Sequence, residues 1–169
     1  MSKKKLLLTG ASGLLGSNLL FCLRDRYDIV GITYSKSVIA VGVRICSLDL
    51  GDAKNLKALV DDAKPDIVIH AAAEANVDKC EENPDMAYQS NVQMTTNVVA
   101  ALHGLNTKLI YISTDLVYDG KKGNFSEADA PNPIKVYGKT KLAGERVAMG
   151  LPRALALRTN FFGWNTIEK

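Results

Sequence analysis

The chain has 169 residues, which is enough for one domain with a sizeable buried core but not for two complete domains. Its 21 Lys and Arg residues against 18 Asp and Glu residues give a net charge of +3, which is too small to indicate nucleic-acid binding. The three cysteines lack metal-ligand spacing, and no apolar run is long enough for a signal peptide or a membrane span, so a cytoplasmic location is expected.

The first element is a short apolar strand, expected over Lys4–Thr9, which runs into a glycine-rich turn and a helix expected over Leu14–Asp25. The turn has the spacing Gly-x-x-Gly-x-x-Gly. Such glycines let a pyrophosphate approach the backbone, and the helix N-terminus offers free N–H groups to the anion. A glycine-rich turn without a ligand is the alternative. The residues predicted to contact a dinucleotide are Gly10, Ser12, Gly13, Leu14, Leu15 and Gly16.

Strand and helix patterns then alternate with short connections, which predicts an α/β fold with a Rossmann-like, doubly wound parallel sheet. Further strands are expected over Ile29–Tyr34, Val43–Leu48, Ile67–His70, Leu109–Ser113 and Leu155–Arg158. Further helices are expected over Ala53–Ala63, Pro84–His103 and Tyr137–Met149. Ligands of such sheets bind beyond the carboxyl ends of the strands, so the residues that follow each strand are the site candidates.

The second strand is followed by residues that bear on the choice of cofactor. An acidic residue at this strand end would hold the adenosine ribose of NAD, and none is present. Ser35 and Lys36 stand there instead, a hydroxyl donor and a point charge that could accept a 2′-phosphate. NADP(H) is therefore favoured, with NAD(H) as the alternative and an ordinary solvated loop as the competing interpretation.

Tyr137 and Lys141 are spaced to lie on one face of a helix, where a phenol and an ammonium group could act together. A phenol ordinarily has a pKa near 10, and a neighbouring cation lowers it. Many amphipathic helices contain this pair by chance, so the pattern gains weight only from what precedes it.

The glycine turn, the Tyr-x-x-x-Lys pair and the run from His70 to Ala73 together resemble the extended short-chain dehydrogenase/reductase superfamily. Residues 77–81, Pro84, Asn91, 113–115, 117–120 and 136–145 narrow the resemblance to the dTDP-4-dehydrorhamnose reductase family. Members of that family continue well past residue 169. The resemblance therefore implies that residues 1–169 form an NAD(P)-binding Rossmann domain whose C-terminal substrate lobe is missing. An apolar patch around Phe161, Phe162 and Trp164 is expected where that lobe would dock.

The resemblance also implies roles for single residues. Thr114 would orient and polarise a substrate carbonyl. Tyr137 would donate a proton and also contact the cofactor. Lys141 would hold the nicotinamide ribose and lower the pKa of Tyr137. Further cofactor contacts are implied for Asp49, Leu50, Ala71, Ala72, Ala73 and Asn91. The chain departs from the family pattern at Ala75, Leu116 and Phe161, close to the expected sugar position.

Three of these positions have plainer interpretations. Asp49 could cap the following helix, with Asp52 competing for that place. Asn91 could be a helix residue that faces solvent rather than one that holds a water near the site. His70 is expected to be a hydrogen-bonded core histidine rather than a catalyst.

The function implied is NADPH-dependent reduction of the 4-keto group of a nucleotide-linked 4-keto-6-deoxy sugar. Two alternatives remain open. One is a nucleotide-sugar epimerase or dehydratase of the same superfamily. The other is a non-catalytic binding module, because the regulatory subunit of methionine adenosyltransferase also resembles this family. A homo-oligomer is compatible with either.

Overall fold

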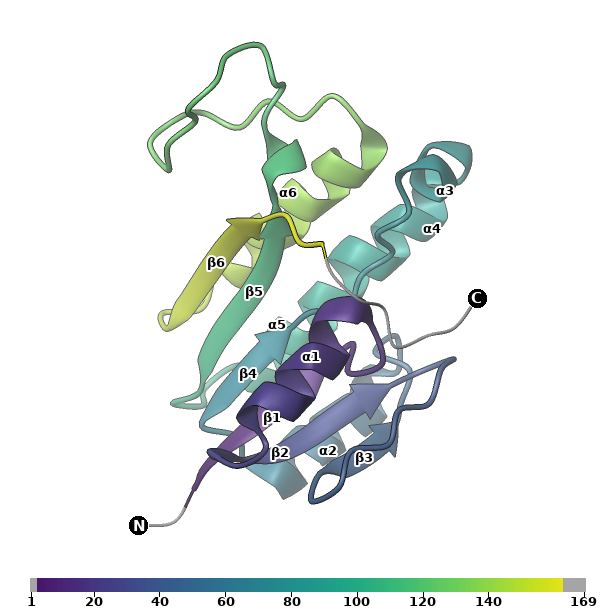
Figure 1. Cartoon of the computed structure of the whole chain (residues 1–169), viewed down its shortest axis with the longest axis vertical. Coiled ribbons are helices and arrows are strands. Elements are labelled where there is room, and N and C mark those ends of the chain that lie inside the picture. The colour runs from purple at the N-terminus through teal and green to yellow at the C-terminus, as the bar shows by residue number, and fades with distance from the viewer. Residues whose placement is uncertain (1–2, 163–169) are drawn as a thin grey trace.

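The computed structural model of the chain describes residues 3–162 and contains one parallel sheet with the strand order β3-β2-β1-β4-β5-β6 (Figure 1). The strands are β1 (Lys4–Thr9), β2 (Tyr27–Thr33), β3 (Arg44–Ser47), β4 (Ile67–His70), β5 (Lys108–Thr114) and β6 (Ala154–Thr159). Every strand pair is parallel. The order reverses between β1 and β4, which is where ligands bind in open sheets of this type.

Two apolar cores lie on the two faces of the sheet because successive side chains of a strand point to opposite sides. Leu7 of β1 belongs to the core beneath α2 (Ala53–Ala63), α5 (Met94–Leu102) and α6 (Val136–Ala148). Leu6 and Leu8 belong to the core beneath α1 (Leu14–Leu23). In Figure 1, α1 lies in front of the sheet while α2 and α5 lie behind it. The predicted doubly wound α/β fold is confirmed.

The element boundaries agree closely where local signals are strong. The predicted ranges of β1, α2 and β4 are those of the structure. The helix predicted over Pro84–His103 is instead three segments in series: α4 (Pro84–Tyr88), the π-helical turn η1 (Gln89–Gln93) and α5. A short helix, α3 (Val77–Glu82), and the 3₁₀ turn η2 (Asp115–Val117) were not predicted. Both are too short to show a periodic pattern in sequence.

The face of β6 on the α1 side is uncovered within the described residues. Leu155 and Leu157 pair with Ile110 and Ile112 of β5, which places them on that face, and each is 42% exposed. Phe162 is 98% exposed and Phe161 is 42% exposed, as expected for the apolar patch. Trp164, the third residue of that expected patch, lies outside the described residues. Among residues 3–162, no helix is both long and apolar enough to cross a membrane.

Candidate active site

The glycine turn requires its glycines for reasons visible in the structure. Gly10 has φ +69°, and a Cβ added there would come within 2.7 Å of the Ala72 nitrogen. A Cβ on Gly16 would collide with the Gly10 carbonyl. The turn is closed by a hydrogen bond from the Gly13 N–H to the Gly10 carbonyl at 3.0 Å. The end of β1, the start of α1 and the segment after β4 therefore meet in close backbone contact.

The N-terminus of α1 is built to receive an anion. Gly13 occupies the N-cap and provides no side-chain acceptor for the first N–H groups of the helix, and the first turn has no acidic residue. Free N–H groups and the positive end of the helix dipole favour a phosphate at such a position. The residues present therefore fit a dinucleotide pyrophosphate, as the sequence predicts.

Two adjoining hollows open at the carboxyl ends of the strands and share Gly10, Gly13, Ala71 and Ala73 in their walls. The β2-side hollow has a volume of about 330 Å³. The β5-side hollow has a volume of about 460 Å³. Together they place most of the predicted site residues in one continuous depression over the point where the strand order reverses.

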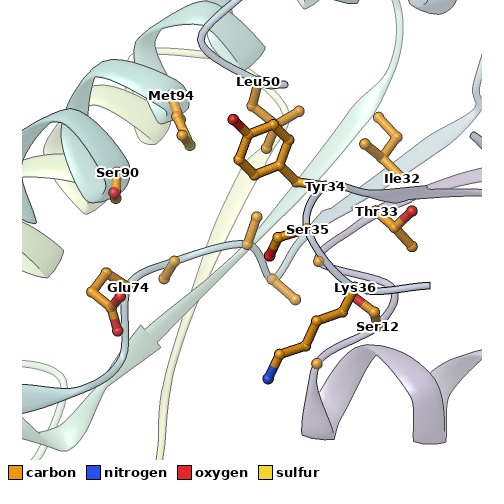
Figure 2. Close-up of a pocket in the computed structure, with 15 residues that line it drawn as sticks. Ser12, Ile32, Thr33, Tyr34, Ser35, Lys36, Leu50, Glu74, Ser90 and Met94 are labelled. Atoms are coloured by element: carbon orange, nitrogen blue, oxygen red, sulfur yellow. The ribbon is translucent and has the colours of Figure 1, made fainter. Parts of the chain in front are cut away.

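The β2-side hollow has one wall from the segment after β2 and an opposite wall from the segment after β4 and from helical residues. Figure 2 shows Tyr34, Ser35 and Lys36 on the segment that follows β2, with Glu74, Ser90 and Met94 across from it. Leu50 also lines this hollow. The second strand thus delivers the hydroxyl and the ammonium group predicted to select a 2′-phosphate.

Asp49 and Asn91 do not line either hollow. The Asp49 carboxylate accepts a hydrogen bond from the Gly51 N–H at 2.7 Å, while Asp52 is the N-cap of α2 and accepts from the Asn55 N–H at 3.0 Å. Asp52, and not Asp49, is therefore the N-cap residue of α2. The interpretation of Asn91 as a solvent-facing residue is wrong, because its side chain is buried and 1% exposed.

The β5-side hollow brings Thr114, Tyr137 and Lys141 together. Thr114 ends β5, and its hydroxyl accepts from the Leu116 N–H at 3.2 Å and donates to the Asp115 carboxylate at 3.1 Å. A Cβ on Gly138 would collide with the Leu116 carbonyl, so only glycine lets α6 begin against the η2 turn. This close approach places Tyr137 beside Thr114. The three positions where the chain departs from the family pattern, Ala75, Leu116 and Phe161, line the same hollow.

Lys141 is a buried cation with two partners beneath the hollow. Its ammonium group donates to the Ile112 carbonyl at 2.6 Å and lies 4.3 Å from the centroid of the Tyr111 ring. Burial lowers the pKa of Lys141 to about 7, although the nearby Glu145 carboxylate acts in the opposite direction. A shift of the protonation equilibrium into the neutral range is typical of functional sites.

Tyr137 does not have the lowered pKa expected from sequence. Burial raises its pKa, and a hydrogen bond with Thr114 opposes that rise. Lys141 is not among the groups that shift the pKa of Tyr137 here, and its ammonium group donates to the Ile112 carbonyl of β5. Thr114, rather than Lys141, is the residue that favours the ionised form of Tyr137 here.

Sequence reasoning missed a charged network that fixes α6 to the sheet. Glu145 of α6 is 6% exposed and accepts a hydrogen bond from Ser113 at 2.6 Å and from Arg158 of β6 at 2.5 Å. Arg158 also donates to the Tyr118 hydroxyl at 2.7 Å. Ser113 and Thr114 both line the hollow, but the Ser113 hydroxyl already donates its hydrogen to Glu145, so Thr114 is the better candidate for a substrate contact. No signal in the sequence pairs these residues, since they are far apart in the chain.

The reversed strand order, the glycine turn and the gathering of Thr114, Tyr137 and Lys141 define a Rossmann-fold protein of the extended short-chain dehydrogenase/reductase superfamily. Comparison with known families gives the narrower identity. The family described as RmlD substrate binding domain matches residues 4–164, and the chain belongs to that family.

Individual relatives carry different names. Methionine adenosyltransferase 2 subunit beta of Xenopus tropicalis is 38% identical over 147 residues, covering 86% of this chain and 43% of the relative. A dTDP-4-dehydrorhamnose reductase of Aggregatibacter actinomycetemcomitans is 35% identical over 161 residues, covering 93% and 51%. The crystal structure of dTDP-4-dehydrorhamnose reductase from Bacillus anthracis in complex with NADP superposes with a TM-score of 0.81 at 32% identity, covering 94% and 54%. The chain thus spans about half the length of these relatives.

Proposed function

We propose that this chain supplies the cofactor-binding and catalytic half of a reductase that converts the 4-keto group of a nucleotide-linked 4-keto-6-deoxy sugar to an alcohol. The observation that carries the proposal is the convergence of Thr114, Tyr137 and Lys141 in one hollow that shares its wall with the glycine turn. A relative 35% identical is named dTDP-4-dehydrorhamnose reductase, which supports the substrate class.

Each residue has one task in this reaction. Reduced nicotinamide, when bound, supplies the hydride to the carbonyl carbon. Thr114 turns its single hydroxyl hydrogen from the Asp115 carboxylate to the substrate carbonyl oxygen and so orients it. Tyr137 gives its phenolic proton to the oxygen as the C–O double bond becomes an alkoxide, so that the product is a neutral alcohol. Lys141, which lines the same hollow, would hold the nicotinamide ribose.

NADP(H) is the favoured cofactor, with NAD(H) as the alternative. The relative from Bacillus anthracis was crystallised with NADP. Ser35 and Lys36 line the β2-side hollow, which fits a 2′-phosphate, and no acidic residue stands at the end of β2. The cofactor contacts proposed are those of the glycine turn, Ser35, Lys36, Leu50, Ala71, Ala72 and Ala73, with Asp49 and Asn91 supporting them from outside the hollows. The three free cysteines fit a cytoplasmic location.

The test is NADPH oxidation by the complete protein in the presence of dTDP-4-dehydrorhamnose. Net loss of NADPH absorbance with one equivalent of reduced sugar is expected. An epimerase or dehydratase of the same superfamily would convert its sugar nucleotide without net loss of NADPH. Sugar conversion at constant NADPH absorbance would therefore contradict the reductase assignment.

A second candidate is a non-catalytic regulatory subunit, which is favoured by the 38% identity to methionine adenosyltransferase 2 subunit beta. Stable capture of a methionine adenosyltransferase catalytic subunit by the complete protein, together with no sugar turnover, would favour this candidate. Turnover without capture would favour the reductase. The presence of Thr114, Tyr137 and Lys141 in one hollow argues for chemistry.

A further inference from the structure

The buried histidine at the end of β4 lies outside both hollows and takes no part in the proposed reaction. His70 is 1% exposed, and both of its ring nitrogens have partners. Its Nδ1 lies 2.7 Å from the Thr9 hydroxyl, and its Nε2 lies 3.1 Å from the Thr95 hydroxyl. It is a hydrogen-bonded core histidine, as expected from sequence, but its partners connect it to the walls of the site.

The neighbouring hydrogen bonds show which group donates and which accepts at each step of a hydrogen-bond chain through His70. Thr95 donates its only hydroxyl hydrogen to the Asn91 carbonyl at 2.9 Å, so it must accept from His70 through an Nε2–H group. A neutral imidazole with Nε2–H has an unprotonated Nδ1, which accepts the hydroxyl hydrogen of Thr9. The Thr9 oxygen in turn accepts from the Ala72 N–H at 3.2 Å. Every link thus runs one way, from the Ala72 N–H to the Asn91 carbonyl.

The surroundings of His70 keep it in this neutral form. Burial and the positive charge of Lys141 lower its pKa to about 3. A neutral histidine has one donor and one acceptor, so the tautomer is fixed by what its two neighbours need. His70 therefore stays neutral at pH values well above 3, and the series of hydrogen bonds keeps its direction there.

The series of hydrogen bonds through His70 ends where the two hollows meet. Ala72 lies in the segment Ala71–Ala73 that walls the β2-side hollow, and its backbone is in contact with Gly10 of the glycine turn. Thr9 directly precedes Gly10 and belongs to β1. The hydrogen bond between Thr9 and Ala72 therefore joins the carboxyl ends of β1 and β4 at the point where the strand order reverses.

We propose that His70 is a positioning residue for the dinucleotide: its single neutral tautomer orients the Thr9 hydroxyl, which holds Ala72 and its neighbours against the glycine turn in the geometry that receives the cofactor. This inference rests on the proposed function for its ligand. The other end of the chain, at Thr95 and Asn91, anchors His70 to the helical layer behind the sheet. Loss of either hydroxyl breaks the chain.

The test uses the variants Thr9→Val and Thr95→Val of the complete protein, alone and combined, with NADPH affinity measured by calorimetry. Each single variant is expected to weaken NADPH binding about tenfold, which corresponds to roughly one hydrogen bond. The double variant is expected to bind no more weakly than the weaker single variant, because one break already disconnects the chain. Wild-type affinity in both single variants, or fully additive losses, would overturn the proposal.

Thr107→Val is the matched control for a merely structural effect. Thr107 is also buried and donates its hydroxyl hydrogen to a carbonyl, that of Pro65 at 2.7 Å. It directly precedes β5 and so lies at the amino ends of the strands, whereas both hollows open at the carboxyl ends. We expect a comparable loss of stability and unchanged NADPH affinity. An equal loss of NADPH affinity in Thr107→Val would mean that the effects of Thr9→Val and Thr95→Val come from general destabilisation. That result would overturn the proposal.

A second measurement separates this proposal from the proposed function. Nitrogen-15 NMR of His70 should show the neutral Nε2–H tautomer between pH 5 and pH 8, and Thr95→Val should speed hydrogen exchange at the Ala72 N–H. If the wild-type protein binds neither NADPH nor NADH, the proposed function fails. The assignment of His70 to the cofactor fails with it, and the NMR result then shows separately whether the hydrogen-bond chain exists. An Nδ1–H tautomer of His70 would overturn the proposal even if NADPH binds. So would a rate of hydrogen exchange at the Ala72 N–H that is the same in Thr95→Val as in the wild type.

Discussion

The side-chain amide of Asn91 binds both backbone groups of Glu74. Its Oδ1 accepts from the Glu74 N–H at 2.9 Å, and its Nδ2 donates to the Glu74 carbonyl at 3.1 Å. The same Nδ2 also donates to the Thr140 hydroxyl of α6 at 3.0 Å. One residue of the π-helical turn therefore ties the segment after β4, which walls both hollows, to the helix that carries Tyr137 and Lys141. Turns of this kind are frequent at functional sites.

We expect Asn91→Leu to destabilise the protein by about 1–3 kcal/mol for each backbone group left unpaired. Asn91→Asp keeps the oxygen that accepts from the Glu74 N–H but loses the hydrogen bonds donated to the Glu74 carbonyl and to Thr140. If the bond from the Glu74 N–H contributes most of the stability, Asn91→Asp should lower the free energy of unfolding less than Asn91→Leu does. Denaturant unfolding checks the stability of both variants. Gln93→Leu, at an exposed position on the same turn, is the control. An unchanged free energy of unfolding in Asn91→Leu would show that the hydrogen bonds of Asn91 to Glu74 and Thr140 contribute nothing to stability.

Tyr137→Phe should lower the turnover number of the complete protein by about 10²- to 10⁴-fold, because the proton donor is removed. NADPH affinity should change little, since the ring remains in place. Steady-state kinetics and cofactor titration measure the two quantities separately. Tyr88→Phe, on α4 and 51% exposed, is the control and should behave as wild type. Normal turnover in Tyr137→Phe would refute the proton-donor assignment.

Lys36→Ala should weaken NADPH binding about tenfold and leave NADH binding nearly unchanged, because only NADPH has the 2′-phosphate that the ammonium group would contact. The ratio of the two dissociation constants is the measurement. Lys122→Ala removes an exposed ammonium group that pairs with Asp129 at 2.5 Å outside both hollows, and it should leave the ratio unchanged. Equal weakening of both cofactors in Lys36→Ala would contradict the selectivity role.

The buried ammonium group of Lys141 should make stability depend on pH. The pKa of Lys141 is about 7 in the folded protein against an ordinary value of 10.5, so between these values the unfolded chain binds one proton more. Stability therefore rises with pH across this window and does not fall. Lys141→Met lacks this contribution. We expect the wild type to gain stability relative to Lys141→Met as the pH rises from about 7 toward 10.

Denaturant midpoints of both proteins at several pH values check this prediction. Lys139→Met, at an exposed position of the same helix, is the matched control and should follow the wild type at every pH. A constant difference between the wild type and Lys141→Met would mean that Lys141 keeps its ordinary protonation in the folded protein.

Some elements were predictable because their signals are local. The range of α2 agrees with the sequence prediction because Asp52 is a strong N-cap and the apolar residues of the helix recur at helical spacing. The glycine turn could also be predicted, because its three glycines are close together in sequence. The structure then shows that Gly10 and Gly16 have no room for a Cβ. The π-helical turn was not predictable. A Cβ on Gly144 of α6 would collide with the Asn91 carbonyl, so the packing of another helix accompanies this local geometry.

The sequence by itself determined the parallel α/β fold, the dinucleotide-type turn and the placement of Tyr137 and Lys141 on one helix, because each depends on residues close together in the chain. Only the tertiary structure decided that Lys141 bonds to the Ile112 carbonyl, that Asn91 is buried on Glu74 and Thr140, and that His70 lies between the hydroxyls of Thr9 and Thr95. These outcomes depend on which polar groups meet after the sheet has formed. A buried polar group must find a partner in the folded chain, and partners far apart in sequence are chosen by packing.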